Sequence, residues 1–141
     1  AEDATTVARK FAEFLRRHAT VQMTSSKGGV FHVAQIAAHN AAFDGPFLQA
    51  WYDRLGIFFP AHRLMLCTLQ RALWYFAEHS WIAPPRNYQL ATLCHYFGTP
   101  FHAADAHEAF GDVRATVGLY RALRSRVNGI PRIDNSLADV A

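Results

Sequence analysis

The stretch that decides the fold class is VFHVAQIAAHNAAFDGPFLQAWYDRLG, which runs from Val30 to Gly56. Its first nine residues, Val30 to Ala38, are mostly apolar and include β-branched and aromatic residues, a composition that favours a mostly buried strand. Asn40 is a typical N-cap residue, and the helix that it predicts covers residues 41–55 and ends at Gly56. A strand that leads directly into a helix indicates an α/β domain.

Asp44 raises the chemical question, because it follows Phe43 in an otherwise apolar segment. A carboxylate close to a core needs a hydrogen-bonding partner, a proton or a metal ion. Taken alone, an acid at this position is more often solvated and stabilises the positive end of the helix macrodipole. Pro46 removes one backbone donor from the same segment, which predicts an irregular first helical turn.

Helical and strand patterns alternate along the rest of the chain. Apolar residues from Val7 to Leu15 recur at helical spacing, and Asp3 or Thr5 can cap that helix. Only one further strand is convincing, so the predicted sheet is too sparse to stand alone. The remaining predicted elements are a loop at 23–29 (MTSSKGG), a strand at 64–69 (LMLCTL), helices near 70–77, 88–97 with Gly98 as the stop, and 109–124, and a loop or linker from 126.

The bulk composition is that of an ordinary soluble globular protein. The chain has 141 residues, 51% hydrophobic and 18% charged, which suits one domain with a real core. Its net charge of +3 permits an anionic partner without requiring one. Two cysteines make no disulfide framework, no apolar run reaches the roughly 20 residues of a membrane span, and the start AEDATTVARK does not resemble a signal peptide. These features predict a cytoplasmic protein that does not associate with a membrane.

A second cluster of chemically useful residues is AHEAFGDVRATVGLY, at 106–120, in which His107 and Asp112 are five residues apart. On one regular helix, at about 100° per residue, they would diverge by roughly 140°. Both can address one site if His107 lies on the preceding loop and Asp112 about one turn inside the helix. Asp105 and Glu108 compete with this arrangement, because they resemble a capping box that would draw His107 into the first turn. The spacing leaves both arrangements open, and both residues could also be ordinary surface residues.

Together, the motifs HNAAFD (39–44) and HEAFGD (107–112) resemble the DnaQ-like superfamily of 3′–5′ exonucleases, in its DEDDh branch. That superfamily includes the proofreading subunits of bacterial replicases and ribonuclease T. The resemblance covers about residues 5–125, including the YQLATLCHYFGTPF segment between the motifs. It implies a ribonuclease H-like exonuclease fold, with a mixed sheet flanked by helices, over residues 1–125, and a tail or linker at 126–141.

The resemblance also implies a role for each site residue. Asp44 and Asp112 become metal-site carboxylates, His107 the general base, Phe43 a platform for a nucleobase near the 3′ end, and Asn40 a residue that shapes the start of the helix. Such enzymes use two Mg²⁺ or Mn²⁺ ions about 3.5–4 Å apart to clamp the attacking and leaving oxygens. Carboxylates are suitable ligands for these ions, and a neutral histidine can take a proton from the attacking water. A cation would therefore explain an acid near the core.

The chain departs from the family pattern at two places. The Asp-x-Glu motif of the first strand, which supplies the other two carboxylates, is not found in this sequence. We therefore expect these residues to be the later two-thirds of an exonuclease domain, without its first strands and part of its active site. The sheet edge beside Val30 to Ala38 is then expected to be exposed or covered by another chain. Cys67-Thr68 stands where relatives often carry Asp-Thr, which affects a local polar contact.

Two classes of function follow from these observations. The first is a metal-dependent hydrolase, a 3′–5′ exonuclease that acts on single-stranded DNA or RNA ends in proofreading, repair or RNA trimming. The second is a non-catalytic nucleic-acid-binding or interaction module on the same fold. A homodimer or a polymerase partner is possible in either case. Three arginines near the end of the last helix could contact phosphates, although the macrodipole alone also favours basic residues there: Arg121, Arg124 and Arg126.

Overall fold

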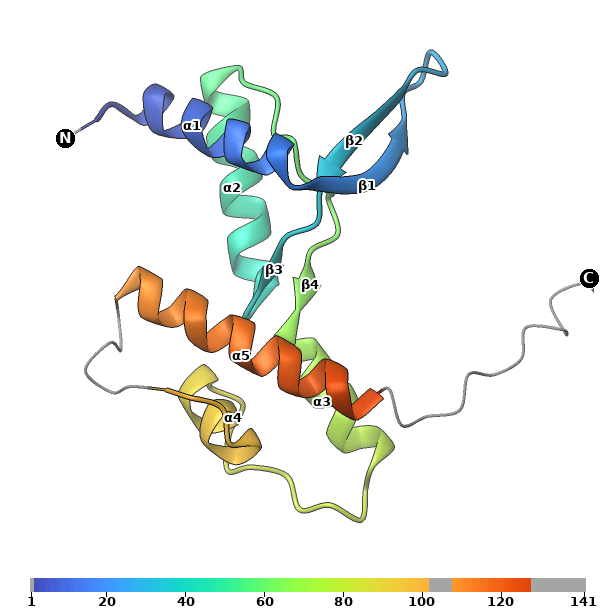
Figure 1. Cartoon of the computed structure of the whole chain (residues 1–141), viewed down its shortest axis with the longest axis vertical. Coiled ribbons are helices and arrows are strands. Elements are labelled where there is room, and N and C mark those ends of the chain that lie inside the picture. Colours follow the sequence, from blue (N-terminus) through green and yellow to red (C-terminus); the bar gives the residue numbers. More distant parts are fainter. Residues whose placement is uncertain (1, 102–107, 128–141) are drawn as a thin grey trace, which may run out of the picture. The chain divides into compact units, whose positions relative to one another are not determined.

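The structure is a computed structural model that describes residues 2–101 and 108–127. The chain divides into two compact units, Ala1–Leu73 and Trp74–Ala141, with the boundary inside a helix. The described residues form a mixed α/β structure that is mostly helical, with five helices and four short strands (Figure 1). In chain order the elements are α1 (Ala4–Arg17), β1 (Ala19–Thr24), β2 (Val30–Ala34), β3 (Ala37–Ala38), α2 (Ala41–Leu55), β4 (Leu66–Cys67), α3 (Thr68–Glu78), α4 (Leu90–Phe97) and α5 (Ala109–Val127).

Helix α1 begins where the sequence predicts. The Asp3 carboxylate accepts hydrogen bonds from the backbone N–H groups of Thr5 and Thr6, at 2.9 and 3.1 Å, and from the Thr6 hydroxyl at 2.6 Å. The Thr6 hydroxyl is the main reason that the pKa of Asp3 is lowered, and the two N–H groups act in the same direction. The capping role of Asp3 is confirmed. No helix in the described ranges is both long and apolar enough to cross a membrane.

Strand β1 was not predicted. The loop expected at 23–29 begins two residues too early, because Met23 and Thr24 belong to this strand. Residues 19–24 pair antiparallel with β2, and the turn between the two strands occupies residues 25–29. Gly28 has a left-handed φ of 81°, and the Gly29 N–H donates to the Ser25 side chain at 2.9 Å. Side chains along β1 alternate between half-buried and exposed. The sequence ATVQMT alternates apolar and polar residues with the same period, so the signal for this strand is present locally although the strand was not predicted.

The single strand expected at 30–38 is broken, and it is less buried than predicted. Only Val33 and Ala34 are buried in β2, and the chain leaves that strand at Ala34. The reason is a change of partner, because the Ala34 N–H donates to the Pro60 carbonyl at 3.0 Å. The chain then forms β3, which pairs parallel with β4. The described residues therefore form two separate two-stranded sheets, and a single mixed sheet stays a prediction.

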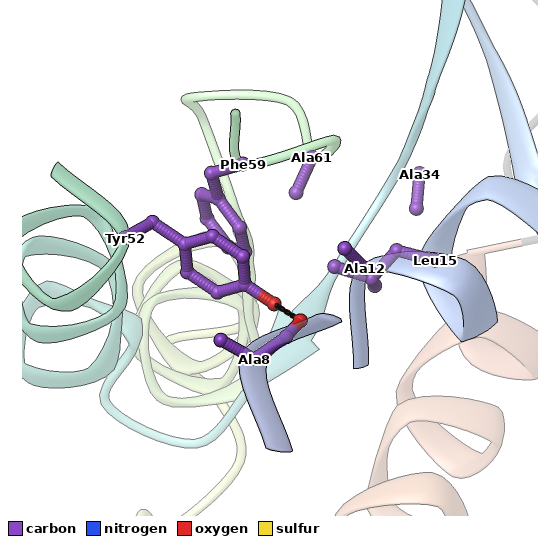
Figure 2. Packing of buried hydrophobic residues seen from close by; sticks show 7 residues of the cluster. All are labelled: Ala8, Ala12, Leu15, Ala34, Tyr52, Phe59 and Ala61. Carbon is purple, nitrogen blue, oxygen red and sulfur yellow. Dashed lines mark hydrogen bonds between the residues drawn. The ribbon is translucent and has the colours of Figure 1, made fainter. Parts of the chain in front are cut away.

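The core of the N-terminal unit surrounds Tyr52, which is fully buried (Figure 2). Its ring lies beside that of Phe59, with 4.7 Å between the centroids. Its hydroxyl donates to the carbonyl of Ala8 at 2.7 Å. This bond joins α2 to α1 and so orients the helix that carries Asp44. The cluster is completed by small and apolar residues of the first helix, the second strand and the 59–61 segment: Ala8, Ala12, Leu15, Ala34, Phe59 and Ala61.

Replacing Tyr52 by phenylalanine should lower the free energy of unfolding at neutral pH by about 0.5–1.5 kcal/mol, the usual contribution of one internal hydrogen bond. Urea denaturation followed by circular dichroism measures this loss. Tyr120→Phe is the control, since Tyr120 is half-buried and its hydroxyl bonds to no residue in the described ranges. An equal loss in both variants would contradict the role assigned to the bond with Ala8.

The same variant should change how stability depends on alkaline pH. Burial raises the pKa of the Tyr52 phenol, while the nearby Arg16 charge acts in the opposite direction. An unfolded chain loses such a proton near pH 10, whereas the folded protein keeps it to a higher pH. The contribution to stability is thus complete below about pH 10 and is lost as pH rises through the raised pKa. Tyr52→Phe should remove this alkaline loss, as measured by urea denaturation between neutral and alkaline pH.

In the C-terminal unit, α4 and α5 pack against each other. Helix α4 ends at Gly98, whose φ of 66° is left-handed, which confirms the predicted stop. The buried Cys94 thiol lies 3.6 Å from the Ala115 carbonyl, and burial raises the pKa of this thiol. Helix α5 confirms the predicted helix at 109–124 and continues to Val127. The rest of the expected tail, from 128, lies outside the described residues. Buried side chains on the two helices are Leu93, Cys94, Phe97, Ala115, Leu119 and Leu123.

Candidate functional site

The HNAAFD segment lies at the end of a parallel strand. Strands β3 and β4 pair with Ala37 opposite Leu66 and Ala38 opposite Cys67, and α2 connects them. His39 follows the last residue of β3 directly. In open α/β sheets, ligands bind beyond the carboxyl ends of parallel strands. This segment lies at the corresponding end of the short β3–β4 pair.

Polar contacts hold the ends of the two strands together. The His39 Nδ1 atom lies 2.9 Å from the hydroxyl of Thr68, which is almost fully buried. The same hydroxyl donates to the Ala38 carbonyl at 3.5 Å. The Ala41 N–H, at the start of α2, donates to the Cys67 sulfur at 3.4 Å. Cys67 and Thr68 thus both contact the segment that carries the motif.

Asn40 precedes α2 as predicted, but its side chain does not cap the helix. Its backbone is left-handed, with φ 66° and ψ 50°, and the side chain makes no capping hydrogen bond. Asparagine tolerates this conformation better than most residues. The Phe43 N–H bonds to the Asn40 carbonyl three residues back, at 2.9 Å, which is tighter than a regular α-helical turn. Asn40 therefore shapes the start of α2 through its backbone, and the capping prediction is wrong.

Asp44 lies in the first turn of α2 and is half-buried. No residue in the described ranges forms a hydrogen bond or an ion pair with its carboxylate. Two aromatic side chains on the same helix are largely exposed, Phe43 at 72% and Phe47 at 60%. A half-buried carboxylate without a protein partner is a suitable ligand for a hard cation. It also lies where the positive end of the helix macrodipole favours an acid.

The other predicted site residues belong to the C-terminal unit. Asp112 is exposed in the first turn of α5, and its N–H donates to the Glu108 carbonyl at 3.1 Å. His107 lies outside the described residues. Because Asp44 and Asp112 belong to different units, their approach across one cleft stays a prediction. Within residues 2–101 and 108–127, no three histidine, cysteine, aspartate or glutamate side chains gather closely enough to hold a metal ion.

A pocket of about 390 Å³ lies beside the first turns of α2, and sequence reasoning missed it. Its walls include Cys67, His62 and Arg63, whereas Asp44 and Phe43 do not line it. Two segments build the pocket, residues 40–49 and 59–70. No local pattern in either segment indicates it, because only the packing of α2 against the second segment creates the cavity.

Three features of the 39–44 segment can support a functional interpretation. It follows the carboxyl end of a parallel strand, it carries a half-buried acid, and it exposes an aromatic ring beside that acid. Neither models of known protein families nor the sequences of curated proteins give a match to this chain.

Proposed function

We propose that this protein is a metal-dependent 3′–5′ exonuclease of the DEDDh type, on a ribonuclease H-like fold. It would hydrolyse phosphodiester bonds at the 3′ ends of single-stranded DNA or RNA with two Mg²⁺ or Mn²⁺ ions. The observation that carries this proposal is the half-buried Asp44 carboxylate, which has no described partner and lies just beyond the end of β3. A divalent cation at this position neutralises the acid and gives it a catalytic role.

The reaction assigns one task to each residue. Bound ions would polarise the scissile phosphate and stabilise the charge that develops on the leaving oxygen. Asp44 and Asp112 hold the cations in this scheme, and Phe43 stacks on the terminal base. His107 takes the proton of the water whose oxygen attacks phosphorus. The bond from phosphorus to the 3′ oxygen of the preceding nucleotide breaks, that oxygen gains a proton from solvent, and a nucleoside 5′-monophosphate leaves.

The assignment can be tested with single-stranded DNA and RNA oligonucleotides that carry a label at the 5′ end. The protein, expressed from its whole coding sequence, should shorten them stepwise from the 3′ end with Mg²⁺ or Mn²⁺. EDTA should abolish the reaction, and mononucleotides should be the released product. Binding of the oligonucleotide without any metal-dependent shortening would instead support the non-catalytic nucleic-acid-binding module on the same fold.

Phe43→Ala should weaken substrate binding by about 1–3 kcal/mol, which is the contribution of one base stack. The Phe43 side chain is largely exposed, so its removal leaves the core intact. Steady-state kinetics should show KM rising while kcat changes little, because the lost contact binds substrate and transition state equally. The matched control is Phe47→Ala, one helical turn further along α2. Equal effects at both positions would contradict a specific platform at Phe43.

A further inference from the structure

A groove of about 430 Å³ runs along one face of α5 in the C-terminal unit. Positions 111, 114, 118 and 121 lie on this face, because residues three and four apart are neighbours on a helix. Gly111 and Gly118 also line the groove, and Gly118 lies against Thr99, whose side chain a Cβ at position 118 would meet at 3.5 Å. Phe101 forms part of the wall opposite the helix and is half-buried. The charged side chains of the groove are Arg114 and Arg121, both exposed.

The positive charge of this face is not compensated within the described part of the chain. Helix α5 carries four arginines and a single aspartate, and no described carboxylate forms an ion pair with any of the four. The Arg114 guanidinium lies over the ring of Phe110, 4.5 Å from its centroid. Stacking of this kind holds the cation in place and leaves its N–H edge free to donate. The groove therefore presents one preorganised cation, Arg114, and a second exposed cation, Arg121, and both suit an anionic partner.

The spacing and the aromatic wall indicate which anion fits. The two groove arginines are seven positions apart, which is about 10 Å along a helix axis. This distance matches roughly three stacked nucleotides, at about 3.4 Å per nucleotide of one strand. Phe101 lines the groove, so an unpaired base bound there can stack on its ring. Cations that follow a backbone, next to an aromatic ring, are the combination that binds single strands without sequence preference.

We propose that this groove binds a segment of single-stranded nucleic acid, with Arg114 and Arg121 on phosphates and Phe101 against a base. The inference deepens the proposed exonuclease function and rests on it for the choice of a nucleic-acid partner. The proposal also distinguishes the arginines of α5 that line the groove from those that do not. Arg124 lies outside the groove, and Arg126 lies over the Phe97 ring, 5.0 Å from its centroid. Only Arg121 of the three arginines near the end of the helix faces the groove.

Fluorescence anisotropy with a short labelled oligonucleotide tests this binding without hydrolysis when EDTA is present. Arg114→Gln and Arg121→Gln should each lower the affinity of the whole protein by about two- to fivefold, as expected for an exposed ion pair. Each should also reduce the slope of log affinity against log salt by about 0.7, which is the value for one phosphate contact on a single strand. Arg124→Gln removes the same charge from the same helix and should change neither quantity beyond experimental error.

A second variant tests the groove without removing an arginine. Val117 lines it and is exposed, so Val117→Glu adds a carboxylate there and should weaken binding through repulsion of phosphates. Equal losses in the Arg124→Gln control would overturn the proposal, and so would duplex DNA or poly-glutamate binding as tightly as the single strand. Failure of the exonuclease assignment has a different signature. Metal-dependent shortening would then be absent, while the two groove arginines still determine oligonucleotide affinity.

Discussion

Asp44→Asn and Asp112→Asn should each remove nearly all of the proposed metal-dependent release of mononucleotides by this protein. Asparagine keeps the shape of aspartate, but a lost negative charge leaves a cation misplaced or unbound. The fold should survive both changes, since the two acids lie in first helical turns and neither bonds to a described residue through its carboxylate. Release of labelled mononucleotide under single-turnover conditions measures the loss.

Asp53→Asn is the matched control for Asp44, because both acids lie on α2. The Asp53 carboxylate is exposed and accepts a hydrogen bond from Gln49 at 2.8 Å, far from the start of the helix. This variant should keep full activity. Titration with Mn²⁺ gives a readout that does not depend on turnover. Asp44→Asn should weaken Mn²⁺ binding, whereas Asp53→Asn should leave it unchanged. Full activity in Asp44→Asn would exclude Asp44 as a metal ligand and remove the main support for the exonuclease proposal.

Several helix boundaries were predictable because their signals are local, whereas α3 begins at Thr68, inside the strand expected at 64–69. The Asp3 cap is two and three residues from the N–H groups that it binds, and Gly56 and Gly98 terminate their helices through their own left-handed backbone. Helix α2 begins and ends at the residues that the sequence predicts. Such signals need no knowledge of which segment packs against which.

The end of β2 and the position of β3 were not predictable, since each depends on a partner distant in sequence. The break after Ala34 exists because that residue bonds to Pro60, and β3 exists because Leu66 and Cys67 pair with it. Strand β1 is different, because its partner β2 follows in the same hairpin and its own residues alternate with period 2, so local reasoning could have found it. No local pattern within residues 30–38 indicates that the chain changes its hydrogen-bonding partner there.

In the candidate site too, features that depend on local sequence were predictable, whereas features that depend on packing were not. The position of Asp44 in the first turn of α2 follows from local rules, whereas the left-handed backbone of Asn40 does not. The groove of α5 also depends on packing, because Phe101 and Arg121 are twenty residues apart. Sequence reasoning could identify candidate acids and cations, but it could not say which of the arginines share a surface.

His107→Ala should lower the rate of hydrolysis by about 10²–10⁴-fold, which is the usual contribution of a general base. The resemblance to the DEDDh branch assigns this role to His107, which lies outside the described residues. A histidine base gives up its proton between about pH 6 and 8, so the rate of the unaltered protein should rise over that interval. His107→Ala should flatten this rise of rate with pH, because no histidine then accepts the proton of the attacking water. Single-turnover rates across this pH range measure both effects.

Loss of a base can be separated from a general disturbance of the fold. Added imidazole should restore part of the rate in His107→Ala, since it can enter the space of the lost ring and accept the same proton. Mn²⁺ binding should be unchanged in this variant, because the carboxylates are intact. His95→Ala, which removes an exposed histidine of α4, should keep both the rate and the pH profile. If the pH profile keeps its slope in His107→Ala, another group accepts the proton, and the carry-over of the HEAFGD motif to this chain is wrong.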